Sequence, residues 1–345
     1  MYQSDNAPVS VTQLEDMLSC PTAGTIEVLG SIEGDLLILG AGGKMGPSLA
    51  LMARRASEMA GVDRRVMAAS RFSSPDARVY LEQNGVETLV SDLLRPGALE
   101  SLPEAENIIF MAGMKFGSTH NLGLTWAMNA YLPGLVCDRY RHSRMVVFST
   151  GNIYGLAPVA SGGSLEDDMP NPQGEYAMSA LGRERVFGYF SNARGIPQSV
   201  IRVNYACDLR YGVLVDIARN VKEGMPVSVN MGYFNTIWQR DANAAALISL
   251  AHARIPPLVL NITGSQTLRV RDVAMVFGGL FDKEIVFHGQ EADDALLSNN
   301  SRARTLFGPP ELDENTLMEW VASWMQQGGL MLDKPTHFES RDGHF

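Results

Sequence analysis

The chain has 345 residues, 46% of them hydrophobic and 19% charged, with a formal net charge of −10. This composition is typical of a globular protein and excludes a disordered chain. The negative charge, with basic residues scattered along the sequence, argues against nucleic acid or an anionic membrane as a partner. A chain of this length predicts one large α/β unit or a main domain with a smaller lobe.

Cysteine usage and the absence of long apolar runs indicate the compartment. Cys20, Cys137 and Cys207 are far apart and odd in number, which fits a reducing compartment and offers neither a disulfide framework nor a CxxC metal site. The first thirty residues hold no basic segment leading into an apolar run, and no apolar run approaches about 18 residues. We therefore expect a soluble, cytoplasmic protein.

The first 33 residues precede the first strong strand and are expected to form a helical extension. Thr12 with Glu15 predicts a capping box for a short helix at residues 12–18. Pro21 would then break that helix.

Short apolar runs alternate with stretches of helical length from residue 35 onward. The runs predict strands at residues 36–39, 66–69, 88–90, 108–111, 145–148, 199–203 and 258–262. The other stretches predict helices at residues 44–59, 75–83, 123–140, 175–193, 213–223, 241–253, 270–278 and 314–326. This alternation predicts an α/β fold, a Rossmann-type doubly wound parallel sheet with a small C-terminal substrate lobe.

The same pattern predicts the domain boundaries. We expect residues 34–206 to form the dinucleotide-binding domain, with residues 236–262 returning to it. Residues 207–235 and 263–345 would form the small lobe. Ligands of open α/β sheets lie at the carboxyl ends of the strands, so the crevice between the lobes is the expected site.

A glycine-rich loop follows the first predicted strand and leads into a helix. Gly40 permits a tight turn, Gly43 lets the backbone approach a diphosphate, and Gly46 lets helix and strand pack closely. Lys44 and Met45 stand between the last two glycines, and we expect the whole loop to bind a dinucleotide at the helix N-terminus.

A P-loop is excluded at this position. That motif needs Gly, four residues, and then Gly-Lys-Ser/Thr. Here Ile38 stands where the first glycine is required, and Met45 follows Lys44.

The end of the second strand predicts the choice of cofactor. An NAD-selective fold usually places an acid there to bind the ribose 2′-hydroxyl. This chain has Ser70 and Arg71 instead, a hydroxyl and a guanidinium that suit a 2′-phosphate. The sequence therefore favours NADP over NAD, the alternative being that Arg71 is a solvated loop residue.

Segments at the ends of the later strands complete a family pattern. They are Asp92-Leu93, Met111-Ala112-Gly113-Met114-Lys115, Asn129 in the long predicted helix, Phe148-Ser149-Thr150-Gly151-Asn152-Ile153-Tyr154-Gly155, Tyr176, and Ile201-Arg202-Val203-Asn204-Tyr205. Together, over about residues 35–310, they resemble the extended short-chain dehydrogenase/reductase family, also called NAD-dependent epimerase/dehydratases. The Ala112–Gly117 segment is especially similar to the UDP-galactose 4-epimerase branch.

The resemblance implies roles for these residues. Asp92, with Leu93, would contact the adenine, and Lys115 in the Ala112-Gly113 loop would reach the cofactor's ribose or phosphate. Asn129 would support that loop at the cofactor. Tyr205 would face the nicotinamide. The substrate-binding residues implied are Asn152, Asn204 and Arg240, and the catalytic pair implied is Thr150 and Tyr176.

One family residue is absent. The family has a lysine four residues after the tyrosine, on the same helix face, where it lowers the tyrosine pKa; here Ala180 stands at that position, while Glu184 matches the acid that follows. A tyrosine without this cation titrates near 10 and is mostly protonated at neutral pH. Lys115 or Arg183 could supply the cation. Alternatively, Tyr176 is only a packed aromatic residue.

The resemblance also limits the reaction. Dehydratases of the family carry two acids after the catalytic Thr, where this chain has Gly151 and Asn152. We therefore expect redox chemistry at a carbinol carbon of a sugar or nucleotide-sugar-like compound, by an NAD(P)-dependent oxidoreductase or epimerase, with Thr150 polarising the oxygen and Tyr176 or a water handling the proton. The alternative is an NAD(P)-binding sensor or assembly subunit with little or no turnover.

Two further expectations concern partners and metals. Relatives pair through the two long helices read here as residues 123–140 and 175–193, so a homodimer is expected. His288, Glu291, Asp293 and Asp294 lie close in sequence but without repeating helical spacing, so we interpret them as a solvated acidic loop and predict no metal site.

Overall fold

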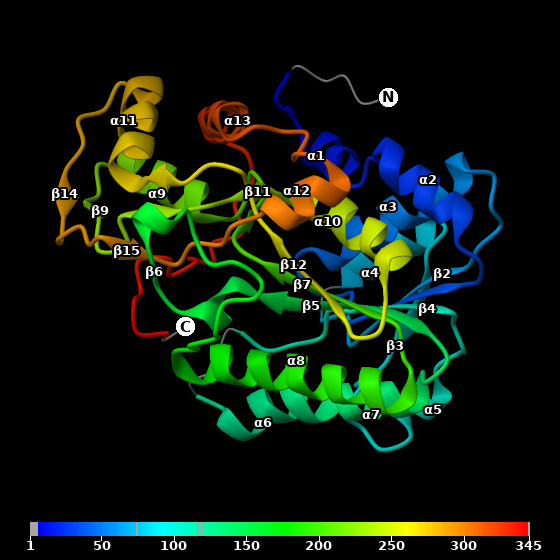
Figure 1. The fold of residues 1–345 in the computed structure, drawn as a ribbon. Helices are drawn as coiled ribbons and strands as arrows, with labels where there is room; N and C mark the ends of the chain where they lie inside the picture. The colour runs from blue at the N-terminus through cyan, green and yellow to red at the C-terminus, as the bar shows by residue number, and fades with distance from the viewer. Residues whose placement is uncertain (1–5, 74, 116, 119, 344–345) are drawn as a thin grey trace.

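A parallel sheet of seven strands forms the centre of the molecule (Figure 1). The computed structural model describes residues 6–73, 75–115, 117–118 and 120–343. The strands stand in the order β12-β7-β5-β4-β1-β2-β3, and each neighbouring pair is parallel. Their bounds are β1 Leu36–Leu39, β2 Val66–Ser70, β3 Glu87–Val90, β4 Asn107–Phe110, β5 Arg144–Thr150, β7 Gln198–Val203 and β12 Leu258–Ile262. The predicted Rossmann-type sheet is confirmed.

Two layers of helices cover the sheet, which explains the continuous apolar runs of its central strands. Along β1, Leu36 and Ile38 enter the core on one face, and Leu37 and Leu39 enter the core on the other. The helices that pack on the first face include α2 Ala23–Ser31, α3 Gly46–Met59, α10 Gln239–Ile248 and α12 Ser301–Phe307. The helices on the second face include α5 Ala98–Ser101, α7 Leu132–Arg139 and α8 Gly174–Arg194. Helix α4, Pro75–Gln83, joins β2 to β3.

A smaller lobe lies beyond the sheet and has its own core (Figure 1). Its helices are α9 Val213–Glu223, α11 Val270–Phe281 and α13 Glu314–Gln326. Short strands complete it or link it to the sheet, namely β6 Ala157–Pro158, β8 Ala206–Cys207, β9 Val227–Ser228, β10 Tyr233–Phe234, β11 Ile237–Trp238, β13 Leu268–Arg269, β14 Phe287–His288 and β15 Asp294–Ala295. Single turns of 3₁₀-helix occur at Gly151–Tyr154, Val159–Ser161 and Ser249–His252.

The N-terminal extension forms two helices rather than one. The first, α1 at Val11–Leu18, is capped by Ser10, whose side chain accepts from the backbone N–H of Gln13. The capping box that we expected at Thr12 is therefore wrong. A capping box does occur at α2, between Thr22 and Thr25, directly after the proline that was expected only to end a helix.

The extension is part of both cores. Helix α1 places Leu14 and Leu18 in the core of the smaller lobe, and α2 places Leu29 in the core on the sheet. Arg64 is buried beneath α2, where its guanidinium donates to the backbone oxygens of Leu29 and Ile32.

The long helix expected at residues 123–140 is interrupted. It consists of α6 Leu122–Trp126, a π-helical turn at Ala127–Tyr131, and α7. The π-helical turn carries Asn129, which is fully buried. Such bulges often occur at functional sites because they turn a side chain out of the regular helical register.

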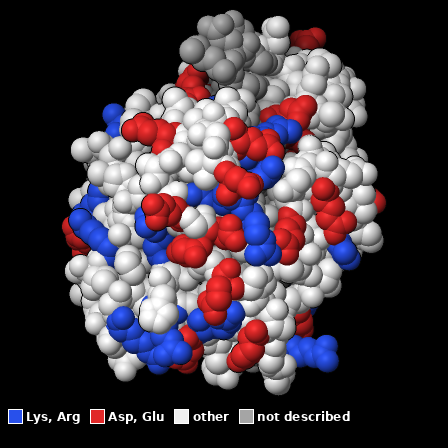
Figure 2. All heavy atoms as spheres, turned by 90° about the vertical axis from the view of Figure 1, so that its right-hand side faces the viewer, with Lys and Arg blue, Asp and Glu red and all other residues white. Residues whose placement is uncertain are grey.

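The surface carries charges of both signs. On the face shown in Figure 2, Lys and Arg side chains are interleaved with Asp and Glu side chains. Exposed pairs such as Arg65 with Glu87 and Arg78 with Glu82 connect them. Within the described residues, no helix is long and apolar enough to cross a membrane.

Candidate active site

A groove runs along the carboxyl ends of the strands, where the chain crosses from one side of β1 to the other. It consists of two adjoining cavities of about 290 Å³ and 230 Å³, which share Gly40, Gly43, Met111 and Gly113. Because β2 and β3 lie on one side of β1 and β4 and β5 on the other, the groove occupies the switch point at which doubly wound folds bind their ligands.

The glycine loop has the geometry that its sequence predicts. Gly40 has a φ of +92°, and a Cβ there would overlap the backbone nitrogen of Ala112. A Cβ on Gly46 would overlap the carbonyl of Ala41, so this glycine lets α3 pack against the loop. At Gly43 the nearest atom to a Cβ would be the Gly40 oxygen at 3.8 Å. Gly43 therefore leaves open space on the groove side.

The first turn of α3 fits an anion at this place. Its N-cap residue, Met45, makes no side-chain hydrogen bond to the first turn of the helix. Backbone N–H groups at a helix start attract anions, and here no side chain of the cap residue satisfies them. The loop and helix thus fit the diphosphate of a dinucleotide.

The 230 Å³ cavity lies at the end expected for the adenosine. It is lined by Ser70, Arg71, Asp92 and Leu93, together with Ala112. Ser70 comes close to the glycine loop, because a Cβ on Gly42 would overlap its hydroxyl. The two side chains on which the NADP prediction depends therefore face the same cavity as the predicted adenine contact, Asp92.

The 290 Å³ cavity, called here the catalytic cavity, contains the predicted catalytic pair. Thr150 ends β5, and its hydroxyl accepts from the backbone N–H of Asn152 at 3.2 Å and donates to the side-chain oxygen of Asn152 at 2.9 Å. Tyr176 lies in the first turn of α8 and lines the same cavity as Thr150. Burial raises the pKa of Tyr176, while nearby Arg183 and the Thr150 side chain act to lower it.

Arg183 brings a cation next to Tyr176 from two turns along α8. Its guanidinium is buried, where it donates to the Phe148 carbonyl at 2.8 Å and to the Asn129 side-chain oxygen at 2.7 Å. A Cβ on Gly113 would overlap this guanidinium, so the glycine makes room for the arginine.

The position of the absent lysine is apolar. Ala180 is buried and packs with Ile153, Tyr154 and Leu181. A lysine at this position would have to displace these side chains. The arrangement explains why the charge near Tyr176 comes from Arg183 instead.

Asn129 holds the loop after β4 from behind. Its side chain accepts from the Met114 N–H at 2.9 Å and donates to the Met114 carbonyl at 3.0 Å and the Ser179 hydroxyl at 2.9 Å. The side chain is fully buried and does not line the groove. It orients the loop that carries Gly113 and Lys115.

Two lysines line the catalytic cavity. The Lys115 ammonium lies 6.0 Å from the centre of the Tyr176 ring, and burial lowers its pKa to about 8. The Lys44 ammonium donates to the Ala206 carbonyl at 3.0 Å and lies 4.3 Å from the centre of the Tyr211 ring. Burial also lowers the pKa of Lys44, although nearby Asp208 raises it.

Segments after β7 form the opposite wall. Asn204, Tyr205 and Tyr211 line the cavity, and Thr336 joins them from the C-terminal segment. Tyr205 has a φ of +48°, a conformation that side chains other than glycine seldom adopt. Its carbonyl is held by the hydroxyl of Thr236 at 2.7 Å.

Most of the residues predicted from sequence therefore meet in one groove. The larger cavity is lined by Thr150, Tyr176, Gly40, Gly43, Lys44, Met45, Gly113, Lys115, Tyr205, Asn152 and Asn204, and the smaller one by Ser70, Arg71, Asp92, Leu93 and Ala112. Gly46 and Asn129 do not line the groove, but they position the loops that do. Sequence reasoning missed Tyr211 and Thr336, for which no motif gave a signal.

Arg240 lies away from this groove. Its guanidinium pairs with Glu311 at 2.6 Å and donates to the backbone oxygens of Cys20 at 3.0 Å and Pro21 at 3.4 Å. These contacts tie the N-terminal extension to α10. The substrate role implied by the resemblance has no geometric support at this position.

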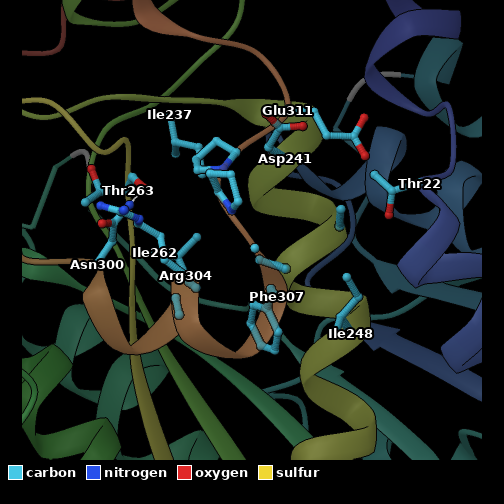
Figure 3. Close-up of a pocket in the computed structure, with 16 residues that line it drawn as sticks. Thr22, Ile237, Asp241, Ile248, Ile262, Thr263, Asn300, Arg304, Phe307 and Glu311 are labelled. Atoms are coloured by element: carbon cyan, nitrogen blue, oxygen red, sulfur yellow. Dashed lines mark hydrogen bonds between the residues drawn. The ribbon is translucent and has the colours of Figure 1, made fainter.

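A separate cavity of about 80 Å³ lies on the face of the sheet covered by α10 and α12 (Figure 3). Ile248, Ile262 and Phe307 give it apolar walls, and Asp241 and Glu311 lie at one end. Burial raises the pKa of Asp241 to about 6. This cavity shares no residue with the groove.

Among the described residues, no group of three or more His, Cys, Asp or Glu side chains could hold a metal ion. His288 and Asp293 do not converge with Glu291, which instead pairs with Arg269 at 2.6 Å and Arg271 at 3.0 Å.

No family model and no curated protein sequence matches the chain. Solved structures do. MoeE5 in complex with UDP-glucose and NAD is 20% identical with a TM-score of 0.68, and the match covers 85% of this chain and 99% of that one.

Two further structures show the same similarity. UDP-glucuronic acid 4-epimerase from Bacillus cereus, with UDP-glucuronic acid and NAD, is 17% identical with a TM-score of 0.72, over 85% of this chain and 99% of that one. A short-chain dehydrogenase/reductase superfamily protein from Agrobacterium tumefaciens, with bound NAD, is 16% identical with a TM-score of 0.70, over 85% and 97%. The chain therefore has the fold of the extended short-chain dehydrogenase/reductases and nucleotide-sugar epimerases that its motifs resemble.

Proposed function

We propose that the protein is an NAD(P)-dependent oxidoreductase or epimerase that acts on a hydroxyl group of a sugar-like compound. The observation that carries this proposal is that Tyr176 and Thr150 line the same cavity as the glycine loop. Proteins of this fold with bound NAD, including nucleotide-sugar epimerases, support it.

Each polar group has a distinct task in this reaction. The Thr150 hydroxyl exchanges its bond to the Asn152 side chain for one to the substrate oxygen. In the oxidising direction the tyrosinate form of Tyr176 takes the substrate hydroxyl proton, and in the reducing direction the neutral phenol returns it. A bound nicotinamide would supply the hydride acceptor and donor. The Arg183 guanidinium stabilises the tyrosinate that forms when Tyr176 loses its proton, a task that the family gives to the lysine absent at position 180.

The cofactor proposed is NADP rather than NAD. Ser70 and Arg71 both line the adenosine end of the groove, and neither is an acid that would repel a 2′-phosphate. Arg71 is exposed enough to reorient toward a phosphate without losing a described ion pair. Parallel titrations with NADPH and NADH, followed by nicotinamide fluorescence, test this preference.

The second candidate is a dinucleotide-binding sensor without turnover, favoured by the absence of the family lysine at Ala180. The two functions differ in one assay. Protein that binds NADPH and also changes the nicotinamide absorbance with a panel of sugar-like alcohols is an enzyme. Binding without any change across the panel supports the sensor.

We further propose a homodimer formed through α6, α7 and α8. Apolar side chains on these helices are exposed in the single chain, notably Leu122, Trp126, Tyr131 and Tyr189. Covering them would stabilise a pair of chains. Sedimentation of the intact chain distinguishes the dimer from a monomer.

Replacement of Gly43 by Ala is expected to weaken cofactor binding at least about tenfold, or about 1.4 kcal/mol, with little change in stability. The added methyl meets only the Gly40 oxygen at 3.8 Å, but it occupies the space expected for the diphosphate. Fluorescence titration and thermal unfolding measure the two effects. Gly279→Ala is the matched control, since a Cβ there meets nothing within 4 Å; equal cofactor affinity in both variants would contradict the assignment.

Cofactor affinity is expected to fall about tenfold between pH 7 and pH 9. Lys115, with a pKa of about 8, is charged below that pH and neutral above it, whereas a bound phosphate would return its pKa toward the ordinary value of about 10.4. The bound state then holds a proton that the free state loses as the pH rises. In Lys115→Gln the pH dependence of cofactor affinity should disappear. If the affinity of the wild-type protein does not change between pH 7 and pH 9, no anion binds at Lys115.

A further inference from the structure

The catalytic cavity is cationic in a protein of net charge −10. Its described lining residues include Lys44, Lys115 and Arg183 but no Asp or Glu. Among the charges near Lys115, Asp216 raises its pKa and Lys44 lowers it. Such a concentration of positive charge in a partly closed cavity favours an anionic ligand.

Lys44 faces the half of the cavity opposite the glycine loop. The backbone of that loop fits the cofactor diphosphate, but the Lys44 side chain extends to Ala206 and Tyr211, which follow β7. Its ammonium can therefore contact a substrate that lies between Tyr176 and Tyr211, both of which line the same cavity.

The C-terminal segment at residues 332–343, named here the strap, borders the substrate side. Thr336 lines the cavity, and both its N–H and its hydroxyl donate to Asp216 of α9, at 2.8 and 2.6 Å. Phe338 is buried against Phe234, with ring centres 6.2 Å apart. Arg341 pairs with Asp294.

The strap ends at the catalytic helix. In Figure 1 the red C-terminal segment reaches the start of α8. A Cβ on Gly343 would overlap the carbonyl of Gln173, and a Cβ on Gly174 would overlap the carbonyl of Gly343. Tyr176 follows two residues later, so the strap spans from the smaller lobe to the helix turn that carries the proposed base.

The partly open cavity beside the strap is small. Its volume is about 290 Å³, and the nicotinamide end of the cofactor must share it with the substrate. Sites for drug-sized ligands usually occupy roughly 300 to 1,000 Å³. The remaining space suits a single sugar ring and not a sugar joined to a nucleotide.

We propose that the substrate is a polyhydroxylated anion of monosaccharide size, with its carboxylate or phosphate held by Lys44, and that the strap excludes nucleotide-sized compounds. This inference rests on the proposed function and narrows its substrate class.

Calorimetry on the intact, cofactor-loaded chain tests the proposal. The probes are glucuronate, glucose 6-phosphate, uncharged glucose and UDP-glucose. We expect at least one of the two small anions to bind at least tenfold more tightly than glucose, and UDP-glucose not to bind. Lys44→Gln should remove the preference for the anion over glucose. The two anions distinguish a carboxylate ligand from a phosphate ligand.

Two variants test the wall itself. A chain that ends at Met331 lacks the strap, and Phe338→Ala removes only its buried anchor; both should admit UDP-glucose. Far-ultraviolet circular dichroism and cofactor affinity report whether each variant is folded. If the shorter chain is unfolded, Phe338→Ala alone provides the test.

The outcomes separate this inference from the proposed function. An intact chain that binds no nicotinamide dinucleotide overturns the proposed function. A chain that binds cofactor and then binds glucose as well as the anions, binds UDP-glucose, or binds neither anion overturns only the substrate assignment. If the folded strap variants also fail to bind UDP-glucose, the strap does not exclude it, and the role of the strap is overturned.

Discussion

Tyr176→Phe is expected to lower kcat by about 10²- to 10⁴-fold, the usual contribution of positioned proton transfer. The substitution removes only the hydroxyl, which lies in the same cavity as Thr150, and leaves the ring beside Lys115. Cofactor affinity should therefore stay within about twofold, since no glycine-loop contact changes. Steady-state kinetics with the substrate found in the panel, together with NADPH titration, measure both quantities.

Tyr189→Phe provides the matched control, because Tyr189 lies on the same helix with an exposed side chain. It should leave kcat unchanged. A Tyr176→Phe protein that keeps wild-type kcat would show that a water handles the proton and that Tyr176 is only a packed ring.

Glu184→Gln should destabilise the fold by about 3–5 kcal/mol, the cost of breaking a buried ion pair. Glu184 pairs with Arg202 at 2.8 Å, and the two side chains are only 8% and 7% exposed. Glu184 also accepts from the Ser149 hydroxyl, and Arg202 donates to the Tyr154 hydroxyl and the Glu166 carbonyl. The amide would leave the Arg202 charge uncompensated beneath the groove.

Urea unfolding, monitored by circular dichroism, measures this loss. Glu87→Gln makes the same chemical change in an exposed pair with Arg65, in which the side chains are 43% and 51% exposed. It should cost less than about 1 kcal/mol. Equal losses in the two variants would mean that the buried pair adds nothing beyond a surface pair.

The sheet could be predicted because each of its strands is marked by a local run of apolar residues in the sequence. Runs such as residues 36–39 are apolar throughout, and only a strand covered on both faces uses such a run between helices. The glycine loop was equally readable, since Gly40 and Gly46 are required by backbone contacts within a few residues of the turn or directly across the switch point.

The features that sequence reasoning missed depend on distant contacts. Thr336 lines the groove only because Asp216, 120 residues earlier, holds it. Tyr211 carries no motif. Arg240 matches a family position in sequence, but its guanidinium is committed to Glu311 and to the N-terminal extension.

Local signals also failed where two were in conflict. Pro21 indicated a break, and it does end the first helix, but the chain re-enters a helix at once because Thr22 and Thr25 cap each other. The interruption of the long helix at Ala127–Tyr131 was not predicted, although Pro133 directly after it was a readable signal, since proline has no N–H for the carbonyl four residues earlier. The contacts of Asn129 with the loop after β4 are tertiary and gave no local signal.

The two N-terminal helices have a consequence for how ligands are exchanged. Glu15 of α1 pairs with Arg210, next to the wall of the groove, while Asp16 of the same helix pairs with Arg55 of α3 on the other side. Adjacent residues of one helix thus form ion pairs on both sides of the groove. Wide hinge opening would have to break both pairs, of which the less exposed Glu15–Arg210 pair is the costlier. We therefore expect entry and release of a dinucleotide to proceed mainly by rearrangement of loops and side chains.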